Sequence, residues 1–238
     1  MSSTLFISDL HLDPARPGVT RALADFLQQH SDCESLYILG DLFEAWVGDD
    51  DDSSLAVQVR GLLRDFSAAG PALYIMRGNR DFLLGEAFCG TVGAQLLDDP
   101  TPIDLHGVPT LLMHGDSLCT ADSDYQDFRT TVTDPVWQTR VLARSLDQRR
   151  GLAAELRAMS GEANSNKAAD IMDVTRDEVE KVMRAHGVRQ LIHGHTHRPT
   201  RHEEVSGVRW VLGDWDTQGW AIEAARNKVN LYNFVITL

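Results

Sequence analysis

The chain has 238 residues, of which 43% are hydrophobic, so it can bury one substantial core within a single domain spanning residues 1–238. Its net charge of −13 repels phosphate-rich polymers and argues against nucleic acid as a partner. No apolar run approaches the roughly 20 residues that span a bilayer, and the N-terminus lacks a signal-peptide pattern, so we expect a cytoplasmic protein. Cys33, Cys89 and Cys119 are odd in number and far apart, which favours reduced, buried thiols.

Short apolar runs recur along the chain, and a polar cluster containing Asp, His or Asn follows each one. In chain order they are Leu5–Ile7 before Ser8–His11, Leu36–Leu39 before Gly40–Asp41, Ala72–Met76 before Arg77–Asp81, Thr110–Met113 before His114–Asp116, Leu191–Ile192 before His193–His197, and Trp210–Leu212 before Gly213–Asp214. Runs of this length predict buried strands. Residues 20–29 and 55–66 have helical apolar spacing, so the alternation indicates an α/β fold. Because ligands bind at the carboxyl ends of strands in such folds, we expect the clusters to converge.

Residues 117–187 interrupt this alternation with a long stretch of helical patterns. We interpret it as a helical cap inserted into the domain and call it the cap segment. Within it, Thr175 and Glu178 resemble a capping box that opens a helix ending at Ala185.

Charge is unevenly distributed between two short stretches. Residues 140–157 carry five arginines against two acids, which suits either an anionic ligand or an anionic membrane surface. An ordinary exposed helix face is an equally good interpretation. The acidic run Asp49–Asp52 is interpreted as a solvated loop.

The polar clusters are rich in side chains that bind metals. Asp9 and His11, like His195 and His197, are two residues apart, and in an extended segment such residues point the same way. Asp41 adds a carboxylate that can bridge two ions, and the remaining ligand candidates are Asn79 and His114. Seven ligands exceed a tetrahedral zinc site but suit two ions roughly 3.5–4 Å apart. Ligation without thiolate favours manganese, iron or magnesium.

Asp9-x-His11, Gly40-Asp41, Gly78-Asn79, His114 and Gly194-His195-x-His197, in this order, resemble the calcineurin-like metallophosphoesterase superfamily. Segments Trp46–Asp50 and Asn79–Leu83 are closest to the branch that hydrolyses UDP-2,3-diacylglucosamine in lipid A biosynthesis. The similarity covers nearly the whole chain, including the cap segment. It implies a two-sheet sandwich flanked by helices.

The resemblance also implies a site and a reaction. Two manganese ions (Mn2+) would be held, one by Asp9, His11, Asp41 and His197 and the other by Asp41, Asn79, His114 and His195. Substrate contacts would fall on Asn79, Arg80, Asp122, Ser160, Asn164, Lys167 and His195, with Asp41, Asn79, Arg80 and His195 as the catalytic group. Metal-activated water would attack the α-phosphorus and release UMP and 2,3-diacylglucosamine 1-phosphate (lipid X). The protein would be a monomer that associates peripherally with the cytoplasmic face of the inner membrane.

Arg80 departs from the wider superfamily, in which many members have a histidine that helps the leaving group depart. An arginine cannot donate a proton at neutral pH but can stabilise charge. It therefore suits a leaving group that needs little protonation, such as a phosphate monoester leaving a pyrophosphate. The competing interpretation is an ion pair between Arg80 and Asp81.

Two functional alternatives stay open. One is a metallophosphoesterase of another nucleotide or phosphate ester, and the other is a non-catalytic scaffold that binds a partner protein. Among the remaining polar residues, we expect Asp116 to orient His114 and His193 to be a supporting or core residue. Asp214 and Trp215 receive no role.

Overall fold

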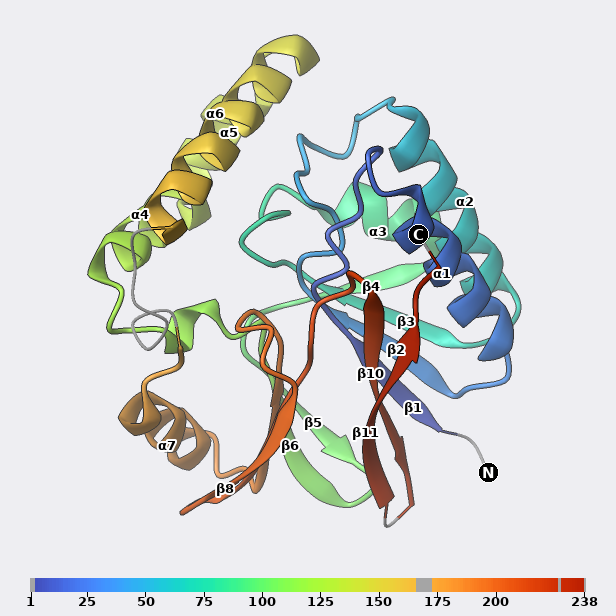
Figure 1. Cartoon of the computed structure of the whole chain (residues 1–238), viewed down its shortest axis with the longest axis vertical. Helices are drawn as coiled ribbons and strands as arrows, with labels where there is room; N and C mark the ends of the chain where they lie inside the picture. The colour runs from blue at the N-terminus through green and yellow to red at the C-terminus, as the bar shows by residue number, and fades with distance from the viewer. Residues whose placement is uncertain (1–2, 166–172, 227, 238) are drawn as a thin grey trace.

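The computed structural model describes residues 3–165, 173–226 and 228–237, with side chains in the first range described up to residue 159 (Figure 1). Its strands are β1 (Thr4–Ile7), β2 (Ser35–Leu39), β3 (Ala72–Met76), β4 (Ala94–Leu97), β5 (Thr101–Leu105), β6 (Val108–Leu112), β7 (Gln190–His193), β8 (Thr200–Glu204), β9 (Gly207–Val211), β10 (Gln218–Ala225) and β11 (Lys228–Val235). Its helices are α1 (Pro17–Gln29), α2 (Ser54–Ala68), α3 (Glu86–Val92), α4 (Ser123–Thr133), α5 (Pro135–Leu142), α6 (Leu146–Ser165) and α7 (Arg176–Ala185), with a 3-10 turn, η1 (Asp116–Leu118). Each of the six predicted strands is present, with ends shifted by a few residues.

Two sheets pack face to face. The first has the strand order β11-β10-β1-β2-β3-β4, in which β1 to β4 are parallel, and the second has the order β5-β6-β7-β9-β8. The core between the sheets is made by side chains of both, including Phe6, Leu39, Met76, Leu112, Ile192 and Ile222. The fold is therefore the two-sheet sandwich that the resemblance implied.

Helices cover the outer faces of both sheets (Figure 1). Helices α1, α2 and α3 pack on the first sheet, and α7 packs on the second through Val179 and Met183. In α2, Ala56, Val59, Leu63 and Phe66 are buried at helical spacing, and the Ser53 hydroxyl accepts the N–H of Ala56 at 3.2 Å. None of the described helices combines the length and hydrophobicity needed to cross a membrane. Cys33, Cys89 and Cys119 are buried and form no disulfide, as predicted.

Helices α4 to α7 fill the described part of the cap segment, and α6 stands beyond the sandwich at the upper left of Figure 1. Val132, Val141, Leu152 and Leu156 pack against the core of the first sheet. Helix α7 begins after Thr175 and ends at Ala185, but the predicted capping box is wrong in its side-chain bond. The Thr175 hydroxyl instead accepts a hydrogen bond from the Thr120 hydroxyl at 2.8 Å.

The acidic run Asp49–Asp52 is not simply a solvated loop, because it seats helix α6. Arg149 donates to both carboxylate oxygens of Asp50 at 2.7 and 2.5 Å, and Arg150 contacts Asp51 at 2.9 Å and Asp52 at 2.6 Å. Asp49 accepts the backbone N–H groups of Gly85 and Phe88, each at 2.9 Å. Two of the five arginines in residues 140–157 are thus balanced within the protein rather than by an external anion.

Arg149 anchors α6 through a buried guanidinium, so Arg149→Ala should destabilise the protein. Its side chain is 4% exposed and also donates to the carbonyl oxygen of Val47 at 2.5 Å. Removing it leaves that carbonyl without its partner, a loss of about 1–3 kcal/mol in the free energy of unfolding, measurable by urea denaturation. Arg150→Ala is the control, because the Arg150 side chain is 42% exposed and the loss of its surface ion pairs should cost less than about 1 kcal/mol. Equal effects of the two substitutions would contradict the anchoring role of Arg149.

Candidate metal centre

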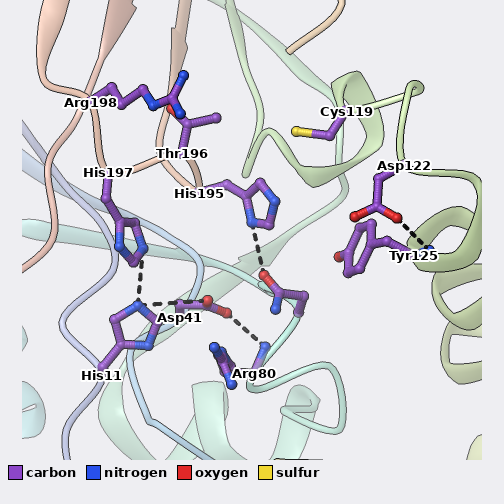
Figure 2. A pocket seen from close by; sticks show the side chains of 11 residues that line it. His11, Asp41, Arg80, Cys119, Asp122, Tyr125, His195, Thr196, His197 and Arg198 are labelled. Atoms are coloured by element: carbon purple, nitrogen blue, oxygen red, sulfur yellow. Dashed lines mark hydrogen bonds and ion pairs between the residues drawn. The ribbon is translucent and has the colours of Figure 1, made fainter. Parts of the chain in front are cut away.

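The loops that follow β1, β2 and β3 in the first sheet and β6 and β7 in the second meet at one edge of the sandwich. They form a pocket of about 230 Å³ that also reaches α4. Figure 2 shows the side chains that line it, among them His11, Asp41, Arg80, His195 and His197. The predicted convergence of polar clusters from distant parts of the chain is therefore observed.

One group of donor atoms comes from Asp9, His11 and His197, whose ligand atoms all lie within 4.8 Å of one another. His197 Nε2 is 3.4 Å from Asp9 Oδ1 and 3.2 Å from His11 Nε2. Such a cluster of inward-facing nitrogen and oxygen atoms has the composition of a divalent metal site.

A second group lies beside the first. Asp9, Asp41 and His114 also place their ligand atoms within 4.8 Å of one another. Asp41 Oδ2 is 3.9 Å from His11 Nε2 and 3.8 Å from His114 Nε2, so it faces both groups. Asn79 Oδ1 lies 3.0 Å from His114 Nε2 and 3.0 Å from His195 Nδ1. All seven predicted ligands thus come together, and Asp41 occupies the place between the groups that a bridging carboxylate needs.

The donor set fits divalent metals. Asp9, Asp41 and His114 are almost fully buried, at 0%, 1% and 0% exposure. Buried carboxylates need a cation or strong hydrogen-bond donors to be stable in their charged form. Mixed carboxylate, amide and imidazole ligation without a thiolate matches metals such as manganese, iron or magnesium.

The backbone of five predicted ligand residues has left-handed φ angles. Asp9, His11, Asp41, His195 and His197 have φ angles of 56°, 48°, 52°, 66° and 54°. Among the described residues, the only other non-glycine residue with positive φ is His106, in the turn between β5 and β6. Left-handed backbone is costly for residues with a Cβ, and it concentrates at functional sites.

These angles correct one premise of the sequence interpretation. Residues 9–11 and 195–197 were expected to be extended, with side chains two apart pointing the same way. Their left-handed φ values show that the strands have already ended and that tight turns aim the side chains. Both pairs still converge on the site, because tight turns direct their side chains there and not because residues two apart in a strand share a face.

Two glycines allow the loops to approach this closely. A Cβ on Gly78 would collide with the side chain and backbone nitrogen of Asp41, and one on Gly194 would collide with Asp9 and Ser8. The glycine before Asn79 and the glycine before His195 are therefore required by packing against the neighbouring ligand loop.

Charges within the site shift several pKa values. Burial would raise the pKa of Asp9, but His197, His114 and His11 together hold it below its usual range. Burial would lower the pKa of His114, but Asp41, Asp116 and Asp9 raise it to about 9. Burial lowers the pKa of His195 to about 4, and the neighbouring His114 adds to this shift. Without a metal, the carboxylates thus hold a proton on His114.

Supporting contacts orient the histidine rings predicted to be ligands. The carbonyl oxygen of Leu39 lies 2.9 Å from His114 Nδ1, and Asp214 Oδ2 lies 3.6 Å from His197 Nδ1. The expected orienting role of Asp116 is therefore filled by Leu39. Asp116 instead accepts hydrogen bonds from Tyr125 at 2.7 Å and Arg129 at 2.8 Å, and it acts on His114 through its charge.

Arg80 and Asp81 do not form the ion pair considered from the sequence. Asp81 is fully buried and accepts the backbone N–H groups of Gly78 at 2.7 Å and Leu42 at 2.8 Å. Burial and the neighbouring Asp41 raise the pKa of Asp81 to about 6. The Arg80 guanidinium instead lies 3.4 Å from Glu44, at the edge of the pocket.

The predicted substrate contacts fall into two groups. Asn79, Arg80, Asp122 and His195 line the pocket together. The side chains of Ser160 and Asn164, and the whole of Lys167, lie outside the described residues. His193, in contrast, is fully buried, with its ring 3.3 Å from Arg209, as a core residue would be.

Tyr125 and Glu44 lie at the site but were not singled out from the sequence, and Asp214, which received no role there, supports His197. The ring centroid of Tyr125 lies 5.7 Å from that of His195. Asp214 follows the predicted strand that ends at Leu212, so its position was visible but its partner was not. Nothing in the local sequence marks Tyr125 or Glu44, because their partners belong to other loops.

Comparison with known proteins agrees with this geometry. Residues 2–199 match the family model of the calcineurin-like phosphoesterases. The chain belongs to this family. An archaeal phosphodiesterase superposes with a TM-score of 0.51 at 13% identity, covering 98% of this chain and 99% of the other, which supports the phosphoesterase fold.

Several relatives are far more similar to this chain in sequence than the archaeal phosphodiesterase is. A UDP-2,3-diacylglucosamine hydrolase of Cellvibrio japonicus is 53% identical over 98% of this chain and 100% of its own length. Another from Marinobacter nauticus is 52% identical over 95% of each chain, and one from Pseudomonas aeruginosa is 51% identical over 94% of this chain and 96% of its own.

Metal binding should release a proton from His114. With its pKa raised from 6.5 to about 9, the protonated ring stabilises the metal-free fold fully below pH 6.5, and this contribution is lost as the pH rises through about 9. A metal needs the neutral ring, so Mn2+ added near neutral pH should displace on the order of one proton. Calorimetry in two buffers of different ionisation enthalpy measures this number.

His114→Gln removes the titrating ring and should remove most of that proton release. His186→Gln, on an exposed residue, is the matched control and should leave it unchanged. Equal proton release by the wild type and His114→Gln would contradict the assignment of the proton to this ring.

Proposed function

We propose that this chain hydrolyses the pyrophosphate bond of UDP-2,3-diacylglucosamine, giving UMP and 2,3-diacylglucosamine 1-phosphate. The observation that carries the proposal is the convergence of seven ligand-type side chains from both sheets on a pocket whose edge holds Arg80. The substrate is supported by two UDP-2,3-diacylglucosamine hydrolases that are more than 50% identical to this chain over nearly its whole length.

The metals proposed for the site are two Mn2+ ions. Asp9, His11, Asp41 and His197 would hold one, and Asp41, Asn79, His114 and His195 would hold the other. When bound, such a pair polarises the phosphoryl oxygens and activates water for in-line attack on phosphorus. Asp41 Oδ2 lies 3.9 Å from His11 Nε2 and 3.8 Å from His114 Nε2, which supports a bridging role for this carboxylate.

Besides the metal ions, side chains of the site would bind and orient the substrate. Arg80 offers a planar guanidinium beside the pocket, which can pair with the departing phosphate without giving up a proton. Asp122 can accept hydrogen bonds from sugar hydroxyls, and it lies on the same wall as Tyr125. Asn79 and His195, 3.0 Å apart, are placed to contact both the metals and the phosphoryl oxygens.

The cap segment, residues 117–187, would shelter the acyl chains and approach the membrane. Arg140, Arg144, Leu142 and Met159 are exposed on α5, α6 and the link between them, which suits peripheral contact with an anionic inner-membrane surface. We propose this contact for a cytoplasmic monomer. Because the acidic run already balances Arg149 and Arg150, the attraction would depend on Arg140 and Arg144.

Asp41→Asn should lower Mn2+-dependent turnover of UDP-2,3-diacylglucosamine by more than about 100-fold, because it removes the charge of the bridging carboxylate. Asparagine is chosen because it keeps the shape of the side chain and tolerates the left-handed backbone at this position, where φ is 52°. Release of UMP from metal-stripped protein, with Mn2+ titrated back, is the measurement. Asp65→Asn, on an exposed residue of α2, is the control. Near-normal activity of the Asp41→Asn variant would defeat the two-metal assignment.

Substrate class is tested by comparing kcat/KM for the lipid nucleotide with that for a soluble aryl phosphate. We expect the lipid nucleotide to be preferred by at least about 100-fold, since Arg80 and the cap segment contribute only when both halves of the substrate are present. A preference for the aryl phosphate would favour another phosphate ester as the substrate. Turnover of neither compound with any divalent metal would favour the scaffold alternative.

A further inference from the structure

Glu44 lies in the loop that follows Asp41, beside the pocket rather than in the row of predicted ligands. Its backbone N–H donates to the carbonyl oxygen of Leu12 at 3.1 Å, so the loop after β2 is fixed to the loop after β1. The side chain is 32% exposed and turns toward the edge of the metal centre. Neither the ligand set nor the substrate contacts proposed above include this residue.

The Glu44 carboxylate faces groups from three parts of the molecule. Its Oε2 lies 3.2 Å from His11 Nδ1, on the side of that ring away from the metal centre. Its Oε1 lies 3.4 Å from Arg80 Nη1 and 3.7 Å from Arg157 Nη1 of helix α6. One carboxylate therefore contacts a proposed metal ligand, a proposed phosphate-binding arginine and the cap segment.

We propose that Glu44 is a positioning residue that sets both the metal affinity of the site and its affinity for the substrate phosphates. The effect on substrate affinity, here called the phosphate half, rests on the proposed function. The effect on metal affinity, called the metal half, does not, because it concerns His11 alone. Each of the two carboxylate oxygens serves one half, so the two effects can be separated experimentally.

The metal half follows from imidazole chemistry. A carboxylate at Nδ1 holds the proton on that nitrogen and leaves the lone pair of Nε2 directed at the metal. His11 Nε2 is the atom that lies 3.9 Å from Asp41 and 3.2 Å from His197 Nε2. At 3.2 Å from Nδ1, the Glu44 carboxylate is thus placed to favour the tautomer of His11 that can bind a metal.

The phosphate half follows from charge. Arg80 and Arg157 come from different segments, and their side chains are only 20% and 19% exposed. Two guanidinium groups this close repel each other, and a carboxylate between them offsets the repulsion before substrate arrives. Because the guanidinium groups are held in advance, less side-chain entropy is lost when an anionic substrate binds.

Two substitutions at one position separate the two halves. Glu44→Gln keeps an oxygen that can accept the Nδ1–H of His11 but removes the negative charge between the arginines. We expect its affinity for Mn2+ to stay within about threefold of the wild type, while KM for UDP-2,3-diacylglucosamine rises about tenfold. Glu44→Ala removes both contacts, and its Mn2+ affinity should also fall by about 10–100-fold.

Mn2+ affinity is measured by calorimetry on metal-stripped protein, independently of turnover, and kcat and KM are measured with saturating Mn2+. Glu155→Gln, on an exposed residue of the same helix α6, is the control and should match the wild type in both. Urea denaturation checks that each variant is folded, and Glu44→Gln carries the test if Glu44→Ala is unstable.

The proposal is overturned if Glu44→Ala binds Mn2+ and the lipid nucleotide as the wild type does. It is also overturned if Glu44→Gln loses as much Mn2+ affinity as Glu44→Ala, because the loss would then come from charge and not from the tautomer of His11. If the wild type fails to turn over the lipid nucleotide while the two variants still differ in Mn2+ affinity, the proposed function fails and the metal role of Glu44 stands.

Discussion

The Asp9 carboxylate, accepting the backbone N–H of His195, is the interaction on which the site depends. Its oxygens lie 3.2 and 3.0 Å from that nitrogen, and the Ser8 hydroxyl donates to one of them at 2.5 Å. Asp9 follows a strand of the first sheet and His195 a strand of the second, so this contact ties the two sheets together where the ligands gather. A fully buried carboxylate is unstable in its charged form unless a cation or hydrogen-bond donors pair with it. The Asp9 side chain that joins the two sheets therefore also favours binding of a cation.

The loops joined by this contact also contain left-handed turns at the predicted ligand residues. Each such non-glycine residue costs about 1–3 kcal/mol of backbone strain, and five of them lie in the loops of the candidate metal centre. The buried carboxylates of the loops offset part of that cost: Asp41 Oδ1 accepts the N–H of Arg80 at 2.7 Å, and Asp81 accepts the N–H groups of Gly78 and Leu42. The loops are therefore held rigidly by one another, which keeps the donor atoms in place before a metal or substrate binds.

Charge also determines how the cap segment meets the rest of the fold. The acidic run Asp49–Asp52 fixes the first turn of α6 through Arg149 and Arg150, and Glu44 meets Arg157 two turns further along the same helix. The acidic composition of the protein is thus partly structural, with carboxylates that converge on the candidate metal centre, accept hydrogen bonds from its loops and pair with the arginines of α6.

The sequence by itself determined the strands that lead to the site, the α/β class and the identity of the residues that converge. It could do so because short apolar runs and the polar residues after them are local features, and because strands in parallel sheets end at a common edge. Tertiary structure alone decided how those residues are aimed and supported. The left-handed turns at Asp9 and His195, the partner of Asp81 and the seating of α6 on Asp50 depend on atoms far apart in the chain. A hydrogen bond or ion pair between distant segments forms only after the sheets have packed, so no local pattern encodes it.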